Sequence, residues 1–178
     1  MIQRIALMVL VVLAIVGFER LPMLQFDKVP YSQPTPIEIF MERISDIESG
    51  GNYRVVNQYG MMGKYQFGMP AVRAVGLRVS RDEFLRNPEL QDTAMVRLMK
   101  LHEKELEHYI DRYDGKTVKG VKITRASIIA GAHFAGAGGV KSFLTNGDHH
   151  GTIDGNGTSL RYYMSKFKDI HLPQLSSS

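Results

Sequence analysis

The chain contains no cysteine among its 178 residues. Disulfide bonds and thiolate metal sites are therefore excluded, and cysteine usage does not identify the compartment. A compact run of Lys and Arg interleaved with aromatic residues is also missing, so we do not expect nucleic acid as a partner. Alternation of apolar and polar residues, which marks half-buried strands, is nearly absent. The fold class expected from these patterns is mainly α.

Three motifs that would indicate a cofactor begin in this sequence but are not completed. The segment His102–Leu106 lacks the second histidine of the zinc-protease helix. The loop that starts at Asp154 lacks the glycine and the final glutamate of a calcium-binding loop. The glycine-rich stretch Gly136–Gly139 does not follow a predicted strand, as a phosphate-binding loop does. We therefore expect neither a metal nor an organic cofactor.

The composition is that of a globular protein. Hydrophobic residues make up 44% and charged residues 22%, and the length suits one domain with a sizeable core. The formal net charge is +4. This mild excess favours an anionic polymer surface as partner without selecting one.

The first twenty residues differ from the rest. Ile5 to Phe18 is an unbroken apolar stretch of fourteen residues preceded by Arg4, which is short for a membrane span and suits a signal peptide. Because no small-residue cleavage site comes after it, we favour an uncleaved membrane anchor in residues 1–20, with a cleaved signal as the alternative. The preceding positive charge orients the C-terminal domain away from the cytoplasm. Residues 21–34, with three prolines, are expected to form an extended linker.

A globular domain is expected over residues 35–170, with a C-terminal tail at 171–178. Thr35 begins its first helix with a capping box that includes Glu38, and Gly50 ends that helix. The helix is expected to bury one apolar stripe, made of Ile37, Phe40, Met41, Ile44 and Ile47. Further helices are expected at about 70–76, after Ser80, at 88–113, 125–134, 140–144 and 160–167. The helix at 88–113 is expected to turn its apolar residues towards the core, namely Leu90, Ala94, Leu98, Leu101, Leu106 and Ile110. The segment 116–122 is either a strand pair or a loop.

Glu48 is the strongest functional candidate. It lies at the end of the first predicted helix, directly before Ser49 and a pair of glycines, and Gly63-Lys64-Tyr65-Gln66-Phe67 comes shortly after. A lone carboxylate next to apolar residues such as Met61, Met62, Tyr65 or Phe67 would have a raised pKa. Such a group can give and take one proton during cleavage of a glycosidic bond.

These motifs resemble the opening motifs of the lytic transglycosylase and goose-type lysozyme superfamily. Glu48-Ser49 is similar to the first motif, and Gly63 and Gln66 match the second. The third corresponds to Ala132-His133-Phe134, where His and Phe replace the usual Tyr and Asn. The resemblance spans roughly residues 36–168 and implies a lysozyme-like domain that cleaves peptidoglycan.

The resemblance also implies a mechanism and partners. A lytic transglycosylase needs one carboxylate, here Glu48, because the C6 hydroxyl of the muramic acid attacks C1 and gives a 1,6-anhydro end. The implied partners are peptidoglycan glycan strands and, through the N-terminal helix, a membrane. The domain would lie on the periplasmic or extracytoplasmic side. Related proteins also occur in phage virions and envelope-spanning transport assemblies, which makes a virion or its membrane an alternative setting.

Five further residues are substrate-binding candidates. Ser49 could bond the Glu48 carboxylate or an N-acetyl group, and Tyr65 could stack on a sugar face. Gln66 matches the substrate-contacting amide of the family, and His133 could line the cleft. Of the late tyrosines Tyr162 and Tyr163, the sequence weakly favours Tyr162 for the cleft.

Two alternatives remain open at this point. A muramidase would use water, with Asp148 or Asp154 as the base. A non-catalytic wall-binding or virion protein could retain the same fold, and the altered third motif supports that interpretation.

Overall fold

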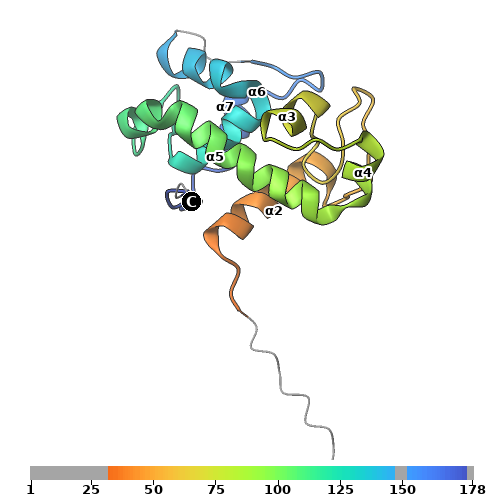
Figure 1. The fold of residues 1–178 in the computed structure, drawn as a ribbon. Helices are drawn as coiled ribbons and strands as arrows, with labels where there is room; N and C mark the ends of the chain where they lie inside the picture. The colour runs from red at the N-terminus through yellow and green to blue at the C-terminus, as the bar shows by residue number, and fades with distance from the viewer. Residues whose placement is uncertain (1–31, 147–151, 176–178) are drawn as a thin grey trace, which may run out of the picture. The chain divides into compact units, whose positions relative to one another are not determined.

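The computed structural model describes residues 32–146 and 152–175 (Figure 1). Within this part the fold is mainly α, as expected, with six helices and one two-stranded hairpin. The proposed anchor, residues 21–31 of the proposed linker and Asp148 lie outside the described residues. No helix in the described part is long and apolar enough to cross a membrane. The elements in chain order are α2 (Pro36–Ser49), α3 (Met69–Ala74), α4 (Arg81–Arg86), α5 (Pro88–Tyr113), β1 (Thr117–Val118), β2 (Val121–Lys122), α6 (Arg125–Thr145) and α7 (Leu160–Ser165).

Local capping sets the helix starts. The Thr35 hydroxyl accepts from the Glu38 backbone N–H while the Glu38 carboxylate accepts from Thr35, so the predicted capping box is confirmed. Asn87 caps α5 by accepting from the Leu90 N–H, and Thr124 forms a second capping box with Ser127 at the start of α6. Gly50 ends α2 in the left-handed conformation, at φ 61°. Helix α6 is broken at Gly136, whose φ is 70°, which matches the two helices expected there.

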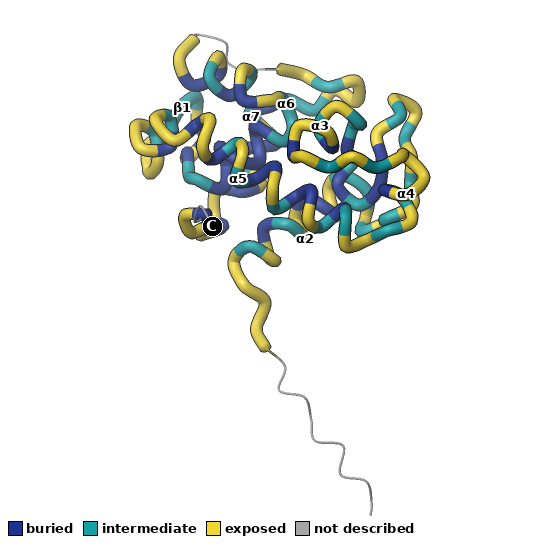
Figure 2. Tube along the Cα trace, viewed as in Figure 1, coloured by how far each residue is buried: buried dark blue, intermediate teal, exposed yellow. Residues whose placement is uncertain are grey.

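The long helix α5 runs through the middle of the domain and packs against α4 and α6, while α6 packs against α7 (Figure 1). The buried residues follow the inner faces of these helices (Figure 2). Phe40 and Ile44 of α2 are fully buried, as the apolar stripe predicted. Ile47 is 43% exposed and Leu101 is 41% exposed, so both predictions of burial are wrong. Apolar spacing defines a face but not how far a neighbouring element covers it.

The core continues beyond the predicted end of the domain. Leu172 and Leu175 are 4% and 7% exposed and belong to the same hydrophobic cluster as Phe40. The Leu175 N–H donates to the buried carboxylate of Glu103 on α5, at 3.1 and 2.9 Å to its two oxygens. Arg125 donates to the same carboxylate. Residues 171–175 are therefore part of the packed domain and not a tail.

The segment between α2 and α3 is folded back on itself by isolated bridges. Met62 pairs with both Val56 and Phe67 in antiparallel orientation. Reciprocal backbone bonds of 2.9 and 2.8 Å join Met62 and Phe67, and the chain turns between them at Gly63–Gln66. This arrangement is a short irregular hairpin.

Gln91 of α5 holds that turn in place. Its side-chain oxygen accepts from the Lys64 N–H at 2.9 Å. Its amide group donates to the carbonyl oxygens of Tyr53 at 2.9 Å and Phe84 at 3.0 Å. Gly63 approaches so closely that an added Cβ would lie 2.0 Å from the Gln91 Oε1 atom. A fully buried amide with its donor and acceptor both satisfied gives the turn a defined position against α5.

Candidate functional site

Glu48 lies one residue before the end of α2, and its side chain is 21% exposed. It lines a pocket of about 300 Å³ that is formed by residues distant in sequence. Two of the five other predicted site residues, Gln66 and His133, line the same pocket. The remaining lining residues are Asn57, Tyr59, Met61, Phe134, Asp154, Gly155 and Asn156.

The pKa of the Glu48 carboxyl is raised above its ordinary value. Burial is the main cause, because removal from water disfavours the charged form. A hydrogen bond from Tyr163 opposes the rise, and the negative charge of Asp154 adds to it. The position of Glu48 at the C-terminal end of α2 also raises its pKa, because the helix dipole disfavours an anion there. The carboxyl therefore stays protonated to a higher pH than an exposed glutamate.

His133 is a buried neighbour of this carboxylate. Its Nε2 atom is 3.8 Å from Glu48 Oε1, within ion-pair distance, and its side chain is 8% exposed. Burial lowers the pKa of His133 to about 4. The pair is therefore not a salt bridge near neutral pH, because the imidazole is uncharged there. Burial outweighs the opposing effect of the Tyr65 backbone, which acts to raise the His133 pKa. The buried Nδ1 atom of His133 has no hydrogen-bond partner among the described residues.

Tyr163, not Tyr162, contacts the candidate acid. The Tyr163 hydroxyl donates to Glu48 Oε1 at 2.7 Å, and its ring is 2% exposed. Tyr162 is 56% exposed, does not line the pocket and lies under the Lys166 ammonium. The weak preference for Tyr162 is thus corrected. The sequence already favoured Tyr163, because Leu160, Tyr163 and Met164 recur at helical spacing and share the buried face of α7.

Replacing Tyr163 by Phe should raise the pKa of Glu48, because the hydrogen bond that favours the ionised form is lost. Carbon-13 NMR titration of the glutamate side chains measures this directly. Tyr162→Phe is the matched control, since it removes a hydroxyl from the adjacent, exposed tyrosine. An unchanged or lower Glu48 pKa in Tyr163→Phe would contradict the assigned contact.

Tyr65 and Ser49 are neighbours in sequence of the pocket residues Gln66 and Glu48, but their side chains make contacts that hold the surrounding loop. Tyr65 is 1% exposed, and its hydroxyl donates to Asp92 Oδ1 at 2.7 Å. The Ser49 hydroxyl donates to the Lys64 carbonyl at 2.7 Å and accepts from the Asn52 N–H at 3.1 Å. Neither residue lines the pocket in this structure. The Ser49 contacts join the end of α2 to the turn after it, and the Tyr65 contact joins that turn to α5.

Gln66 has the backbone conformation of a functional or tightly constrained position. Its φ is 51°, in the left-handed region that residues with a side chain rarely adopt. The side-chain amide donates to the Gly63 carbonyl at 3.0 Å, which helps to hold this conformation. As a result, Gln66 reaches the pocket from the turn while Phe67, the next residue, is buried in the core.

A second loop, residues 152–159, completes the pocket. Asp154 Oδ1 accepts from the N–H groups of Asn156 at 3.0 Å and Thr158 at 2.7 Å, which closes a tight turn. Asp154 is thus both the organiser of this turn and a second carboxylate in the Glu48 pocket. Sequence reasoning placed it in a late loop, but no local pattern indicated which element it would face.

Sequence reasoning missed the pocket residues Asn57, Tyr59 and Asn156. All three lie in loops, where no periodic pattern reveals direction. Asn57 carries one recognisable signal, because asparagine often bonds to the backbone of a turn. In the structure its Oδ1 accepts from the N–H groups of Tyr59 and Met61. Phe134 belongs to the third motif, and its ring stacks on that of Tyr163 with the ring centroids 4.7 Å apart.

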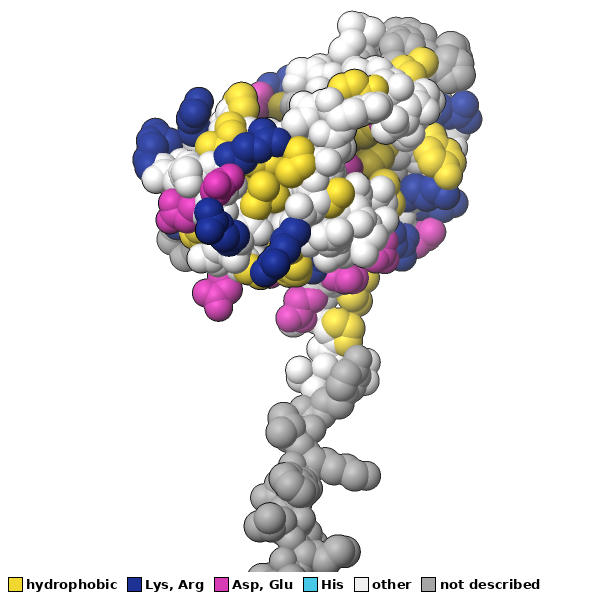
Figure 3. Space-filling view, turned by 90° about the vertical axis from the view of Figure 1, so that its right-hand side faces the viewer, with side chains coloured by type: hydrophobic (Ala, Val, Ile, Leu, Met, Phe, Trp, Pro, Cys, Tyr) yellow, Lys and Arg dark blue, Asp and Glu magenta, His cyan; other side chains and the backbone are white. Residues whose placement is uncertain are grey.

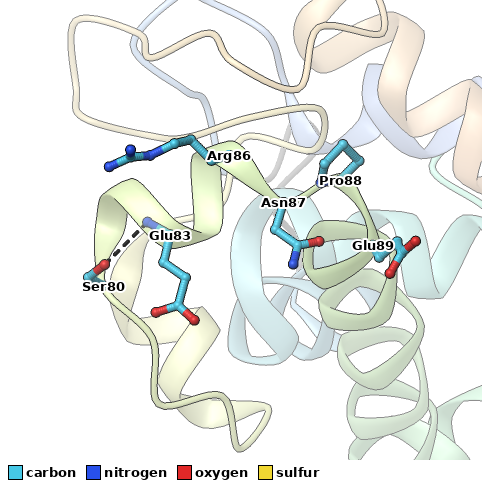
Figure 4. Close-up of a pocket in the computed structure, with 6 residues that line it drawn as sticks. All are labelled: Ser80, Glu83, Arg86, Asn87, Pro88 and Glu89. Carbon is cyan, nitrogen blue, oxygen red and sulfur yellow. Dashed lines mark hydrogen bonds between the residues drawn. The ribbon is translucent and has the colours of Figure 1, made fainter.

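Other surface features carry less chemistry. A depression of about 690 Å³ lies where α4 meets α5, but its charged side chains splay apart and Ser80 is occupied in capping α4 (Figure 4). On the face shown in Figure 3, basic, acidic and apolar side chains are interspersed. That face therefore presents no continuous basic stripe of the kind that nucleic-acid-binding proteins use.

Comparison with protein-family models, with curated proteins and with solved structures gave no significant match. The interpretation of the pocket therefore depends on its own residues and on the motif resemblance.

Proposed function

We propose that this domain is a lysozyme-like enzyme that cleaves peptidoglycan as a lytic transglycosylase, with Glu48 as the single general acid and base. The observation that carries the proposal is the Glu48 carboxyl itself. It is desolvated, its pKa is raised, Tyr163 holds it, and it shares a pocket with Gln66. A carboxyl in this state can protonate a glycosidic oxygen near neutral pH.

The proposed reaction has two proton transfers. Protonated Glu48 gives its proton to the oxygen that links muramic acid C1 to the next sugar, and that bond breaks as positive charge develops on the ring. The ionised Glu48 then accepts the proton of the C6 hydroxyl while that oxygen bonds to C1. The enzyme returns to its starting state, and the products are a new free hydroxyl and a 1,6-anhydro end.

The surroundings support this assignment of roles. Burial raises the pKa of Tyr163 well above its ordinary value, so its hydroxyl remains a donor and orients the carboxyl. Neutral His133 does not supply a positive charge that would hold the carboxyl ionised. The neighbouring amides of Gln66, Asn57 and Asn156 suit the acetamido groups of the substrate.

One observation favours a second candidate. Asp154 lines the same pocket as Glu48, so a muramidase with Asp154 as the base for water is chemically possible. The two reactions give different products. Mass spectrometry of fragments released from purified sacculi should show anhydro-muramic ends for the proposed lyase, and reducing ends for the hydrolase.

Asp154→Asn sharpens this distinction. It keeps an oxygen at the position of Oδ1 for the turn bonds to Asn156 and Thr158, and removes the charge. A lyase should retain cleavage, whereas a hydrolase that needs this base should lose it. Binding of sacculi without release of either product would instead support a non-catalytic wall-binding protein and overturn the proposed function.

A further inference from the structure

Tyr59 is a large aromatic residue at the edge of the Glu48 pocket. It is 58% exposed and nevertheless lines the pocket. Its backbone is held in a tight turn, because Asn57 Oδ1 accepts from the Tyr59 N–H at 2.9 Å and the Gly60 N–H donates to the Asn57 carbonyl at 3.0 Å. The ring is therefore presented from a fixed base and not from a frayed loop.

The phenol end of Tyr59 lies against the loop on the other side of the pocket. A Cβ added to Gly155 would lie 2.3 Å from the Tyr59 hydroxyl oxygen and 2.8 Å from its Cζ atom. Gly155 does not have a positive φ, unlike Gly157 in the same loop, so its backbone conformation does not require glycine. The space that a side chain would fill at residue 155 is occupied by the Tyr59 ring.

We infer that Tyr59, seated against Gly155, is the platform on which a sugar ring of the glycan strand stacks next to Glu48. This inference rests on the proposed function and adds a specificity-determining residue to it. An exposed aromatic face is complementary to the apolar C–H face of a pyranose. Asn57 and Asn156, which line the same pocket, provide polar groups for the hydroxyl and acetamido groups of such a sugar.

The arrangement also suits binding because the platform is ordered before the ligand arrives. The turn at Asn57 fixes one end of the Tyr59 side chain, and contact with Gly155 limits the other. A ring that is already positioned loses little conformational entropy when a sugar stacks on it. An opposite role is also testable: if Tyr59 only obstructed the pocket, its removal would improve binding.

The test measures binding of a soluble tetrasaccharide, two repeats of N-acetylglucosaminyl-N-acetylmuramic acid, by calorimetry. The parent is the full-length Glu48→Gln protein, which should bind without turnover. Tyr59→Ala should weaken binding about tenfold, and Tyr59→Phe should remain within about twofold, since the ring face is kept. Tyr162→Ala is the control, because Tyr162 is equally exposed (56%) but lies outside the pocket.

Gly155→Ala supplies an independent arm. The new methyl group should displace Tyr59 and weaken binding in the parent, but should have no further effect once Tyr59 is already alanine.

Unchanged or tighter binding by Tyr59→Ala would overturn the inference, as would a parent that does not bind the tetrasaccharide. If the Tyr59 pattern holds while the wild-type protein leaves sacculi uncut, the inference stands and the proposed catalysis fails. If cleavage depends on Glu48 but Tyr59→Ala binds normally, the proposed catalysis stands and the inference about Tyr59 fails.

Discussion

Replacing Glu48 by glutamine is expected to reduce the release of soluble fragments from purified sacculi on the order of a thousandfold. Glutamine has nearly the same shape, and its side-chain oxygen can still accept the Tyr163 hydrogen bond, but it has no proton to give. Both proton transfers of the proposed reaction are then lost. Fragment release should be followed over at least three decades of enzyme concentration, so that a residual rate is measured and not assumed.

The same substitution should stabilise the protein at neutral pH. The folded-state pKa of Glu48 is raised by burial, so the ionised carboxylate at high pH is less favourable in the folded protein than in the unfolded chain. The contribution of Glu48 to folding stability is complete below the pKa of the unfolded chain. It is lost as pH rises through the pKa of the folded protein. Glu48→Gln should therefore melt at a higher temperature than wild type at pH 7.5, and the difference should shrink towards pH 4.

Glu107→Gln is the matched control for both measurements. Glu107 is an exposed glutamate of α5 outside the Glu48 pocket, and the change leaves the proposed mechanism untouched. It should keep cleavage at the wild-type rate. Two results would count against the assigned role: full fragment release by Glu48→Gln, or a Glu48→Gln protein that is less stable than wild type at pH 7.5.

Acid should destabilise the domain through His133. Burial lowers its pKa to about 4 in the folded protein, while an unfolded histidine titrates near 6.5. Between these two values the unfolded chain binds the proton and the folded protein does not, so stability falls as pH decreases. The contribution of His133 over this range is about 3 kcal/mol. His102 adds a loss of the same sign, because burial lowers its pKa to about 4 as well.

The groups that face His133 set the size of this effect. Glu48 acts in the opposite direction as it protonates, the Tyr65 backbone hydrogen bond raises the His133 pKa, and the Phe67 ring lies 6.1 Å away. Denaturant unfolding between pH 7 and 4.5 should show a shallower loss of stability in His133→Leu than in wild type. Proton NMR of the imidazoles supplies a direct measurement that requires no variant. A His133 resonance that titrates near pH 6.5 would contradict the prediction.

Local chemistry made the helix framework predictable from the sequence. Thr35, Asn87 and Thr124 cap helices through contacts within three residues, so their effect does not depend on the rest of the fold. Ile47 and Leu101 show where this reasoning ends. Each has the correct spacing for a buried face, but burial depends on which distant element covers that face.

The candidate site was predictable only where a sequence motif or a helix carried it. Glu48, Gln66 and His133 are predicted in this way, and all three line one pocket. Tyr59 and Asn156 could not be found, because their direction is set by turns whose partners are far away in sequence. The choice between Tyr162 and Tyr163 is a different case, since the helical spacing of α7 already favoured Tyr163 as the inward residue.

The carboxylate of Glu103 also defines where this protein can be shortened. It accepts hydrogen bonds from the Leu175 N–H and from Arg125. Removal of residues 172–175 would leave this buried carboxylate with one donor fewer and would expose the core surface that Leu172 covers. A protein trimmed for crystallisation, or joined to another domain, should therefore retain the chain through Leu175.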